Sequence, residues 1–343
     1  MRWSVKSVLG WGVAGCMAVA GGCQSGALSV AGRGERVKAD DGFEVMAYRF
    51  TLSPRPAGEP RATVLYIQGS EDRSVTGSMG ALAGFCAMNA PVIAGERRGV
   101  SPDGSVDREV ALKHATRACR VGDAMAVLRW GTASAPAGKP VVVLGASEGG
   151  DVAAAVAARA PGVTHVILLG SGGGWTQEEE FRHFVRTRGA YLDLKSEEDL
   201  DARVADIKAH PDADTMWAGH PYRRWGTFMF ERAADDLLGV DCPILVVHGD
   251  RDESVPVEGA RALKAEFERA GKTNLTLVEI PGADHRFADP ATGASRLPLV
   301  EVAIVEWLGR LGVLDAKEVG VYLGRVRAAH PDLFPATAAG QAR

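Results

Sequence analysis

The segment Gly145-Ala146-Ser147-Glu148-Gly149 has the spelling G-x-S-x-G, with a serine between two glycines. The apolar run Val141–Leu144 ends just before it, and a helical stretch rich in Ala and Val starts just after it, at Asp151. A chain that reverses sharply from strand to helix holds the serine at the turn in a strained conformation, with its hydroxyl projecting outward. We expect Ser147 to be a nucleophile, against the alternative of an ordinary serine in a glycine-rich turn.

The neighbours of this serine have expected roles as well. Side chains at Gly145 and Gly149 would collide across so tight a turn, which explains why both positions are glycine. The backbone N–H of Glu148 would lie at a helix N-terminus, where the helix dipole and a free N–H favour a developing oxyanion. The motif therefore predicts an attacking group and one oxyanion donor together.

A serine hydroxyl is a poor nucleophile at neutral pH and needs a base with an orienting carboxylate. Among the eight histidines, only His285 lies in a turn after the last clear strand. The others fall in a helix, in a strand, in the region 172–239, before an acidic turn or in the tail: His114, His165, His183, His210, His220, His248 and His330. Asp250 and Asp252 both follow the apolar run 243–247, and position alone leaves both as candidate acids.

In chain order, Ser147, the acidic turn and His285 resemble the α/β-hydrolase superfamily of serine hydrolases, in which nucleophile, acid and base follow strands in this order. Esterases, dienelactone hydrolases and the catalytic domains of prolyl-oligopeptidase-type peptidases share this pattern. The spelling H-G-x-x-D-x-x-V-P over His248–Pro256 is closely similar to the segment that carries the family's acid. The resemblance spans about residues 42–312, and it implies Asp252 rather than Asp250 as the acid.

The resemblance also implies a second oxyanion donor in the loop after an early strand, here Gln68-Gly69-Ser70-Glu71. The superfamily often has His-Gly there, so Gln68 is a departure. Because a backbone N–H donates, the expectation survives that change, and the amides of Ser70 and Glu71 are both candidates. The segment Gly95–Ser101 is similar to the family's D-x-R-G-x-G-x-S, with Glu96 in place of Asp, and we expect it to be structural.

The elements that must position these residues alternate along the chain. Six runs are expected to be strands: 62–68, 91–95, 140–144, 163–169, 243–247 and 275–280. Apolar positions three and four residues apart predict one helix over 110–128, and a second helix is expected over 151–160, stopped by Pro161. This alternation predicts an α/β fold, with a mostly parallel sheet that helices cover on both faces.

Residues 172–239 break the alternation and are expected to form a helical cap inserted over one end of the sheet. Their many aromatic side chains either wall an apolar substrate pocket or fill the cap's own core, and both interpretations stay open. The segment Gly219–Trp225 is either a clamp for a carboxylate or a solvated surface turn. The acidic runs Glu178–Glu180 and Glu197–Asp199 are expected to be solvated helix starts, the second capped by Ser196.

The composition is that of an ordinary globular chain. Of 343 residues, 46% are apolar and 24% charged, and 39 Lys and Arg against 43 Asp and Glu give a net charge of −4. This balance lacks the basic footprint of a nucleic-acid-binding protein. The sequence has no phosphate-binding loop, no H-E-x-x-H and no Cys/His metal spacing, so we expect neither cofactor nor metal. Cys86, Cys119 and Cys242 are expected to be buried small side chains, with a Cys86–Cys119 disulfide as the alternative.

The N-terminus has the pattern of an export signal, with a basic start, a short apolar stretch and small residues before a cysteine. Residues 1–22 are expected to be a signal peptide that resembles those of bacterial lipoproteins, in which the cysteine after the cleavage site is acylated. Cys23 is the expected lipidation site and Cys16 the rival. Residues 23–41 would then be a linker and 42–312 the hydrolase domain. Residues 313–343 would be a C-terminal extension, which ends in Ala, Gly and Gln and is expected to fray.

These expectations define a function and its alternatives. The leading hypothesis is a serine hydrolase that cleaves a small carboxylic ester or thioester through an acyl-enzyme. The alternatives are a serine peptidase of the prolyl-oligopeptidase type and a non-catalytic lipoprotein that binds a partner. In each case the protein would be exported and held at the cell envelope by a lipidated N-terminus, or be periplasmic or secreted without that modification. A lipid anchor would be its only contact with a membrane.

Overall fold

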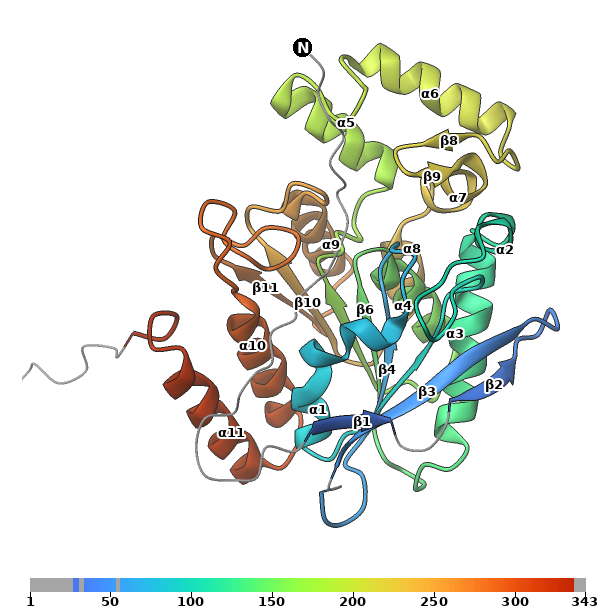
Figure 1. The fold of residues 1–343 in the computed structure, drawn as a ribbon. Helices are drawn as coiled ribbons and strands as arrows, with labels where there is room; N and C mark the ends of the chain where they lie inside the picture. Colours follow the sequence, from blue (N-terminus) through green and yellow to red (C-terminus); the bar gives the residue numbers. More distant parts are fainter. Residues whose placement is uncertain (1–26, 31–33, 54–55, 336–343) are drawn as a thin grey trace, which may run out of the picture.

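The computed structural model describes residues 27–30, 34–53 and 56–335, and the predicted signal peptide and Cys23 lie outside them. These residues form a nine-stranded sheet with the order β1-β3-β5-β4-β6-β7-β10-β11, and β2 pairs with β3 at its side (Figure 1). The strands are β1 Ala27–Val30, β2 Glu35–Lys38, β3 Glu44–Ser53, β4 Thr63–Ile67, β5 Val92–Gly95, β6 Val141–Ala146, β7 His165–Leu169, β10 Ile244–Gly249 and β11 Leu275–Ile280.

Strands β5, β4, β6, β7, β10 and β11 run parallel, and they are the six strands that the sequence predicts. The antiparallel edge of β1, β2 and β3 was not predicted. The expected linker 23–41 is therefore wrong for residues 27–30 and 35–38, which are strands paired with β3. Short, mostly exposed strands of charged residues such as β2 lack the apolar alternation by which a strand is recognised.

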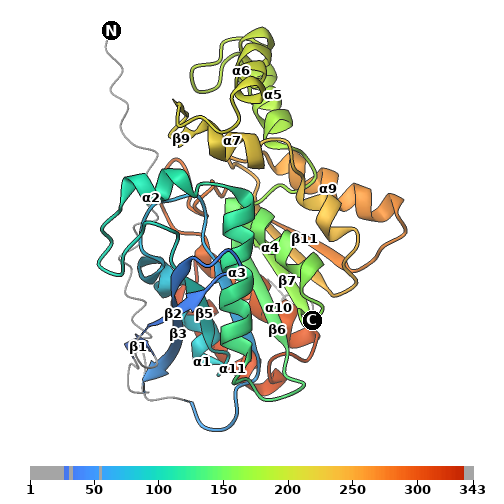
Figure 2. The same cartoon turned by 90° about the vertical axis from the view of Figure 1, so that its right-hand side faces the viewer.

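Helices cover both faces of the sheet, as predicted. One face carries α3 Arg117–Thr132, α4 Glu148–Arg159, α8 Ala233–Leu237 and α9 Val257–Arg269, and the other carries the 3-10 helix Val75–Leu82, α1 Ala83–Ala87, α10 Leu297–Arg310 and α11 Ala316–Ala329 (Figure 2). A separate apolar core fills the space between the sheet and each helix layer. The inner strands β4, β6, β7 and β10 are thus buried on both sides, which explains their largely apolar sequences.

The single helix predicted over 110–128 is instead two helices, α2 Arg108–Lys113 and α3. Asp107 caps the first, and the Thr116 side chain accepts a hydrogen bond from the N–H of Cys119 at the start of the second. A threonine that caps a helix takes extended backbone angles and so interrupts the preceding turn. The apolar residues keep their helical spacing across this break, so their pattern alone does not reveal that the helix is interrupted.

The cap contains α5 Gln177–Arg188, α6 Glu197–Ala209, the hairpin β8 Met216–Trp217 and β9 His220–Pro221, and α7 Tyr222–Phe228. It lies above the carboxyl ends of the parallel strands (Figure 1). Most of its aromatic side chains pack on one another in a core of its own: Phe181, Tyr191, Trp217, Tyr222, Trp225 and Phe230. Helix α8 packs on α4 in the main domain. The cap therefore ends near residue 230, before the expected 239.

Two expectations about acidic helix starts have different outcomes. Ser196 caps α6 by accepting a hydrogen bond from the N–H of Asp199, as predicted. Thr176 and Glu179 form a reciprocal capping box at the start of α5. Glu180, in contrast, is buried, and the interpretation of Glu178–Glu180 as fully solvated is wrong. Burial, with the nearby charges of Asp252 and Asp151, raises the pKa of Glu180 well above its usual value.

The C-terminal extension is part of the fold in residues 313–335, and the frayed tail expected there is wrong for this stretch. Helix α11 packs against α10 and places Val319 and Leu323 in the core. Cys86 is buried as expected, whereas Cys119 and Cys242 are only half-buried. All three are free, so the alternative of a Cys86–Cys119 disulfide is wrong. Within the described residues, no helix has the length and apolar character needed to cross a bilayer.

Candidate active site

Ser147 lies between β6 and α4 with backbone angles φ 52° and ψ −126°. A positive φ is costly for a serine, and the turn is held by a hydrogen bond of 2.8 Å from its N–H to the carbonyl of Leu169. A Cβ on Gly145 would lie 2.1 Å from the carbonyl oxygen of Gly149, which is the predicted collision. A Cβ on Gly149 would instead lie 2.2 Å from the carbonyl oxygen of Ile67, so β4 rather than the turn itself requires that glycine.

The structure brings the three predicted side chains into one hydrogen-bonded chain. His285 Nε2 lies 3.1 Å from Ser147 Oγ, and His285 Nδ1 lies 2.7 Å from Asp252 Oδ2. The residues follow β6, β10 and β11, three parallel strands whose carboxyl ends meet at one edge of the sheet. Because a base must reach the proton that it removes, the first distance is the one on which the chemistry depends.

Local hydrogen bonds orient the acid and separate it from its neighbour. Asp252 Oδ1 accepts bonds of 2.8 Å from the N–H groups of both Ser254 and Val255, which leaves Oδ2 for His285. Asp250 Oδ1 accepts a bond of 2.6 Å from the N–H of Gly282 and so fastens the His285 turn to the acidic turn. The buried His248 supports the acid from the other side: its Nε2 lies 3.0 Å from the carbonyl of Val255 and 3.4 Å from Asp252 Oδ2.

The electrostatic environment favours an ionised Asp252 and a basic His285 in this hydrogen-bonded row of side chains. Burial opposes the charged form of Asp252, but the charge of His285 and hydrogen bonds from His248 and His285 hold the pKa of Asp252 well below its usual value. Burial likewise opposes the charged form of His285, but the charge and hydrogen bond of Asp252 prevail and raise the pKa of His285 above 6.5. A basic imidazole beside an ionised carboxylate is what a general base for a hydroxyl requires.

The loop after β4 approaches the serine closely, since a Cβ on Gly69 would lie 3.3 Å from Ser147 Cβ. Arg120 donates to the carbonyl of Gly69, and Arg97 donates to the carbonyl of Ser70. In a trans peptide the N–H of the next residue points away from such a carbonyl, so these arginines turn the amides of Ser70 and Glu71 in the opposite direction. Among the hydrogen bonds of the described residues, none uses either amide, or that of Glu148, as a donor.

The sequence does not predict a buried ion network around the side chain of Glu148, the residue that follows Ser147. Glu148 Oε1 lies 2.5 Å from Arg120 Nη1, and Glu148 Oε2 lies 2.7 Å from Arg224 Nε. All three side chains are at most 9% exposed. Burial opposes the charged form of Glu148, but the charges of Arg224 and Arg120 hold its pKa well below the usual value.

This network joins three parts of the chain: α4 contributes Glu148, α3 contributes Arg120 and the cap helix α7 contributes Arg224. Arg120 also donates 2.6 Å to the carbonyl of Gln68 in the loop after β4. The interpretation of Gly219–Trp225 as a solvated surface turn is therefore wrong, because Arg224 is buried against the main domain. The adjacent Arg223 and Arg224 in that segment were the available signal, but no local pattern indicates the distant carboxylate of Glu148.

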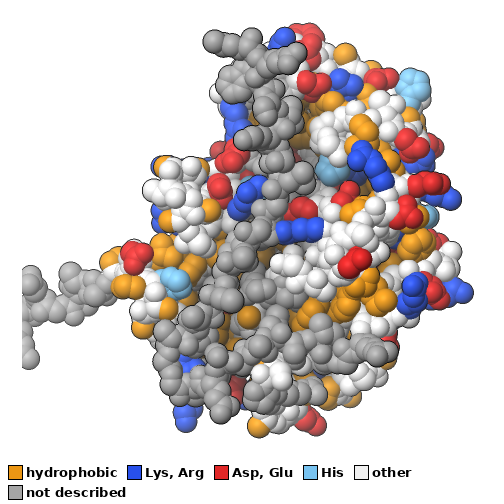
Figure 3. Space-filling model, viewed as in Figure 1, with side chains coloured by type: hydrophobic (Ala, Val, Ile, Leu, Met, Phe, Trp, Pro, Cys, Tyr) orange, Lys and Arg blue, Asp and Glu red, His pale blue; other side chains and the backbone are white. Residues whose placement is uncertain are grey.

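Among the described residues, no cluster of three or more His, Cys, Asp or Glu has the arrangement of a metal site. Acidic and basic side chains are interspersed rather than segregated on the face shown in Figure 3. The polar groups at the sheet edge are thus a hydroxyl, an imidazole, a carboxylate and unpaired amides, a set suited to acyl transfer.

Comparison with known proteins gives a family model described as serine aminopeptidase, S33, which matches residues 120–289. Esterase LipQ of Mycobacterium tuberculosis is 33% identical over 89 residues, which are 26% of this chain. Those residues are 20% of the relative, so the match spans about a fifth of that esterase's length. The matched family segment contains Ser147, Asp252 and His285.

Solved structures share the fold at low sequence identity. Est1E from Butyrivibrio proteoclasticus, solved with ferulic acid bound, superposes with a TM-score of 0.58 at 22% identity and covers 80% of this chain and 97% of its own. A carboxyl esterase from Bacillus coagulans gives 0.58 at 18% identity, covering 82% and 98%. An acylaminoacyl peptidase from Pyrococcus horikoshii gives 0.58 at 12% identity, covering 82% and 42%.

Proposed function

Because this chain belongs to the α/β-hydrolase superfamily, we propose that it is a serine hydrolase that cleaves carboxylic ester or thioester bonds through an acyl-enzyme. The observation that carries the proposal is the hydrogen-bonded chain of Ser147, His285 and Asp252 at one edge of the sheet. The esterases among its relatives support the same class of reaction.

In the first half of the reaction, His285 Nε2 takes the proton of Ser147 as Oγ attacks the carbonyl carbon of the substrate. The carbonyl oxygen becomes an oxyanion, which the amides of Glu148 and of Ser70 or Glu71 stabilise. When the carbonyl reforms, the alcohol or thiol leaves with the proton from His285. Ser147 then carries the acyl group as an ester, and Asp252 has held the imidazole in the tautomer that this transfer needs.

In the second half, His285 takes a proton from water, and the hydroxide attacks the acyl carbon. The acid leaves, and Ser147 recovers its proton from His285. Each cycle therefore consumes one water and returns every residue to its starting state, with no cofactor.

Labelling with a fluorophosphonate probe tests the proposal, because such probes phosphonylate activated serines. We expect the purified chain to be labelled at Ser147 and the Ser147→Ala variant to remain unlabelled, with peptide mass spectrometry locating the adduct. A folded wild-type chain that neither takes up the probe nor hydrolyses acyl esters would contradict the proposal and favour the alternative of a binding protein.

A serine peptidase is the second candidate, since the matched family model is described as serine aminopeptidase and one structural relative is an acylaminoacyl peptidase. The two candidates differ in the leaving group, an alcohol or an amine. Comparing kcat/KM for p-nitrophenyl acyl esters and aminoacyl anilides distinguishes them. We expect the ratio of kcat/KM for the esters to kcat/KM for the anilides to exceed the ratio of their rates of hydrolysis by hydroxide.

We also propose that the protein is exported and anchored to a membrane through a diacylglyceryl group on Cys23. The basic start, apolar stretch and small residues before that cysteine support this placement. Mass spectrometry of the mature protein tests it: the expected N-terminal peptide begins at a lipidated Cys23. A mature chain that begins elsewhere with an unmodified residue would refute the anchor.

A further inference from the structure

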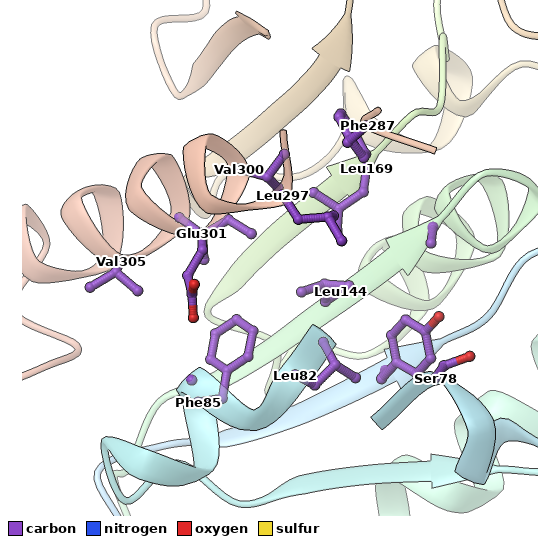
Figure 4. Close-up of a pocket in the computed structure, with 14 residues that line it drawn as sticks. Ser78, Leu82, Phe85, Leu144, Leu169, Phe287, Leu297, Val300, Glu301 and Val305 are labelled. Carbon is purple, nitrogen blue, oxygen red and sulfur yellow. The ribbon is translucent and has the colours of Figure 1, made fainter. Parts of the chain in front are cut away.

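An apolar pocket lies between the sheet and α10, on the face that also carries α1; we name it the α10 pocket (Figure 4). The sheet provides Tyr66, Leu144, Ala146 and Leu169, α10 provides Leu297, Val300, Glu301, Ile304 and Val305, and the remaining lining residues are Ser78, Leu82, Gly84, Phe85 and Phe287. Its α10 residues span two turns of helix, roughly 12 Å. The lining is mostly hydrocarbon, and its polar side-chain groups are the Glu301 carboxyl and the hydroxyls of Tyr66 and Ser78.

One end of the pocket lies beneath the reacting groups. Ala146, in its floor, is the residue before Ser147, and the carbonyl of Leu169 accepts the hydrogen bond from the N–H of Ser147. Phe287, in its wall, lies two residues after His285 and has a φ of 54°. A positive φ is strained for a phenylalanine, and here it accompanies a ring that is buried in the pocket wall.

The other end is polar (Figure 4). Glu301 reaches from α10 toward Phe85, and the hydroxyl of Tyr322 on α11 donates to its Oε1. The second oxygen, Oε2, is buried and has no hydrogen-bond partner. A Cβ on Gly84 would lie 2.6 Å from both Glu301 Oε1 and the Tyr322 hydroxyl, so glycine leaves room for this pair.

An unpaired carboxyl oxygen at the end of an apolar pocket is costly unless something pairs with it. Burial raises the pKa of Glu301, so its oxygen meets a ligand either as a carboxyl or as a carboxylate. A hydroxyl group can both donate and accept, and it therefore pairs with either form. A linear chain that enters beneath Ser147 with a hydroxyl at its far end would satisfy both ends of the pocket.

We propose that the α10 pocket binds the acyl chain of the substrate and that Glu301 hydrogen-bonds a terminal hydroxyl on that chain. The inference rests on the proposed function, because the acyl group must be attached to Ser147 for its chain to enter here. It names the substrate class as esters of ω-hydroxy acids with unbranched chains. The alcohol part of the ester leaves on the cap side and does not enter the pocket.

The first test uses the wild-type chain and two substrate series. In p-nitrophenyl esters from acetate to octanoate, we expect kcat/KM to rise by about fourfold per methylene until the pocket is filled. In alkyl acetates with alcohols of increasing length, we expect little change. A flat acyl series, or a length preference on the alcohol side alone, would overturn the inference.

The second test concerns the polar end. We expect 6-hydroxyhexanoate to 10-hydroxydecanoate esters to include one length that exceeds its unsubstituted analogue by about tenfold in kcat/KM. Glu301→Leu should abolish that preference and Glu301→Gln should retain most of it. Glu306→Leu, on the same helix but outside the pocket lining, is the matched control and should leave the preference unchanged. Loss of the preference in Glu306→Leu, or its survival in Glu301→Leu, would contradict the role of Glu301.

Two further measurements keep the outcome independent of any folding defect. Alkylboronic acids form adducts with an activated serine, and we expect their inhibition constants for the wild type to fall with alkyl length; a constant value would overturn the inference. Fluorophosphonate labelling separates the two proposals. If Ser147 is labelled but neither chain length nor the terminal hydroxyl matters, the pocket assignment fails and the serine hydrolase stands. If Ser147 is not labelled, the proposed function itself fails.

Discussion

The carboxyl ends of the parallel strands, which form the edge of the sheet that carries Ser147, Asp252 and His285, hold their polar residues differently from the cap. At the edge, each reacting side chain is oriented by backbone groups close in sequence or by the adjacent strand, as Asp252 is by the amides of Ser254 and Val255. In the cap, Arg224 is oriented by Glu148, which is 76 residues away in the chain. The first arrangement survives wherever the strands pair, whereas the second exists only when the cap is seated on the main domain.

The edge can therefore carry the proposed chemistry by itself, while the cap reaches it through the buried contact of Arg224 with Glu148. In the proposed mechanism, Glu148 supplies an oxyanion amide from its backbone, while its side chain makes the contact with the cap. Arg120, its other partner, also binds the carbonyls of Gln68 and Gly69. Seating of the cap and placement of both oxyanion donors are therefore physically joined, and substitutions on the two sides should separate chemistry from positioning.

The largest effects are expected at the edge. Ser147→Ala should lower kcat by on the order of 10⁶-fold and Asp252→Asn by about 10⁴-fold, because one removes the nucleophile and the other stabilises the wrong imidazole tautomer. Steady-state hydrolysis of a p-nitrophenyl ester measures both. Asp250→Asn is the matched control, since an amide oxygen still accepts from Gly282. An equal loss of kcat in the Asp250 and Asp252 variants would contradict the assignment of the acid.

A substitution in the cap should be weaker in its effect on chemistry but large for stability. Arg224→Met leaves the buried Glu148 with one partner, for which a loss of about 3 kcal/mol in unfolding free energy is expected. We also expect kcat to fall more than KM rises, because the oxyanion amides lose their positioning. Denaturant unfolding and steady-state kinetics measure the two effects.

The adjacent Arg223 provides the control for this variant, as it pairs with Asp212 and Asp214 at the exposed side of α7. Arg223→Met should cost under about 1 kcal/mol and leave kcat unchanged. Arg224→Lys should restore part of the loss, since it keeps the charge but not the geometry. If both methionine variants behaved alike, the contact between Arg224 and Glu148 would have no special role.

A smaller effect concerns the pH at which the edge works. The base must be neutral, and Asp252 raises the pKa of His285 above 6.5. Activity is therefore lost as the pH falls through that raised pKa, and we expect the acid limb of kcat/KM to have its midpoint above 6.5. A neutral ester substrate and the rate of fluorophosphonate labelling should give the same midpoint. A midpoint below 6.5 would mean that desolvation outweighs the carboxylate.

The same contrast explains what the sequence predicts and what it leaves hidden. The six parallel strands, Ser147 and His285 follow from patterns a few residues long, because a buried strand and its turn are locally encoded. Family resemblance, and not position in the turn, favours Asp252 over Asp250, because the two side chains differ in their partners only once the turns meet. The ion network of Glu148, Arg120 and Arg224 has no local pattern, since each member belongs to a different element.

The errors in the fold have related physical causes. The strands β1 and β2 are only four residues long and pair antiparallel with β3 at the side of the sheet, so it is pairing with β3 that defines them rather than a periodic pattern of their own. Helix α11 shows only a narrow apolar stripe, with Val319 and Leu323 in the core, and so resembled an unstructured tail. In both cases the stabilising contact is tertiary, as it is for Arg224.

The smallest effect tests whether the cap is held by its own helices or by its contact with the edge. Thr176→Ala removes the capping box at the start of α5 and should cost about 1 kcal/mol, with fraying confined to the first turn. Thr187→Ala, on the same helix, removes only a hydroxyl bonded to the carbonyl of His183 and should be neutral. Hydrogen exchange measures the fraying. If kcat stays constant in Thr176→Ala, the buried contact of Arg224 is sufficient to keep the oxyanion amides in place, whereas a fall in kcat would show that the folding of α5 itself is transmitted to the edge.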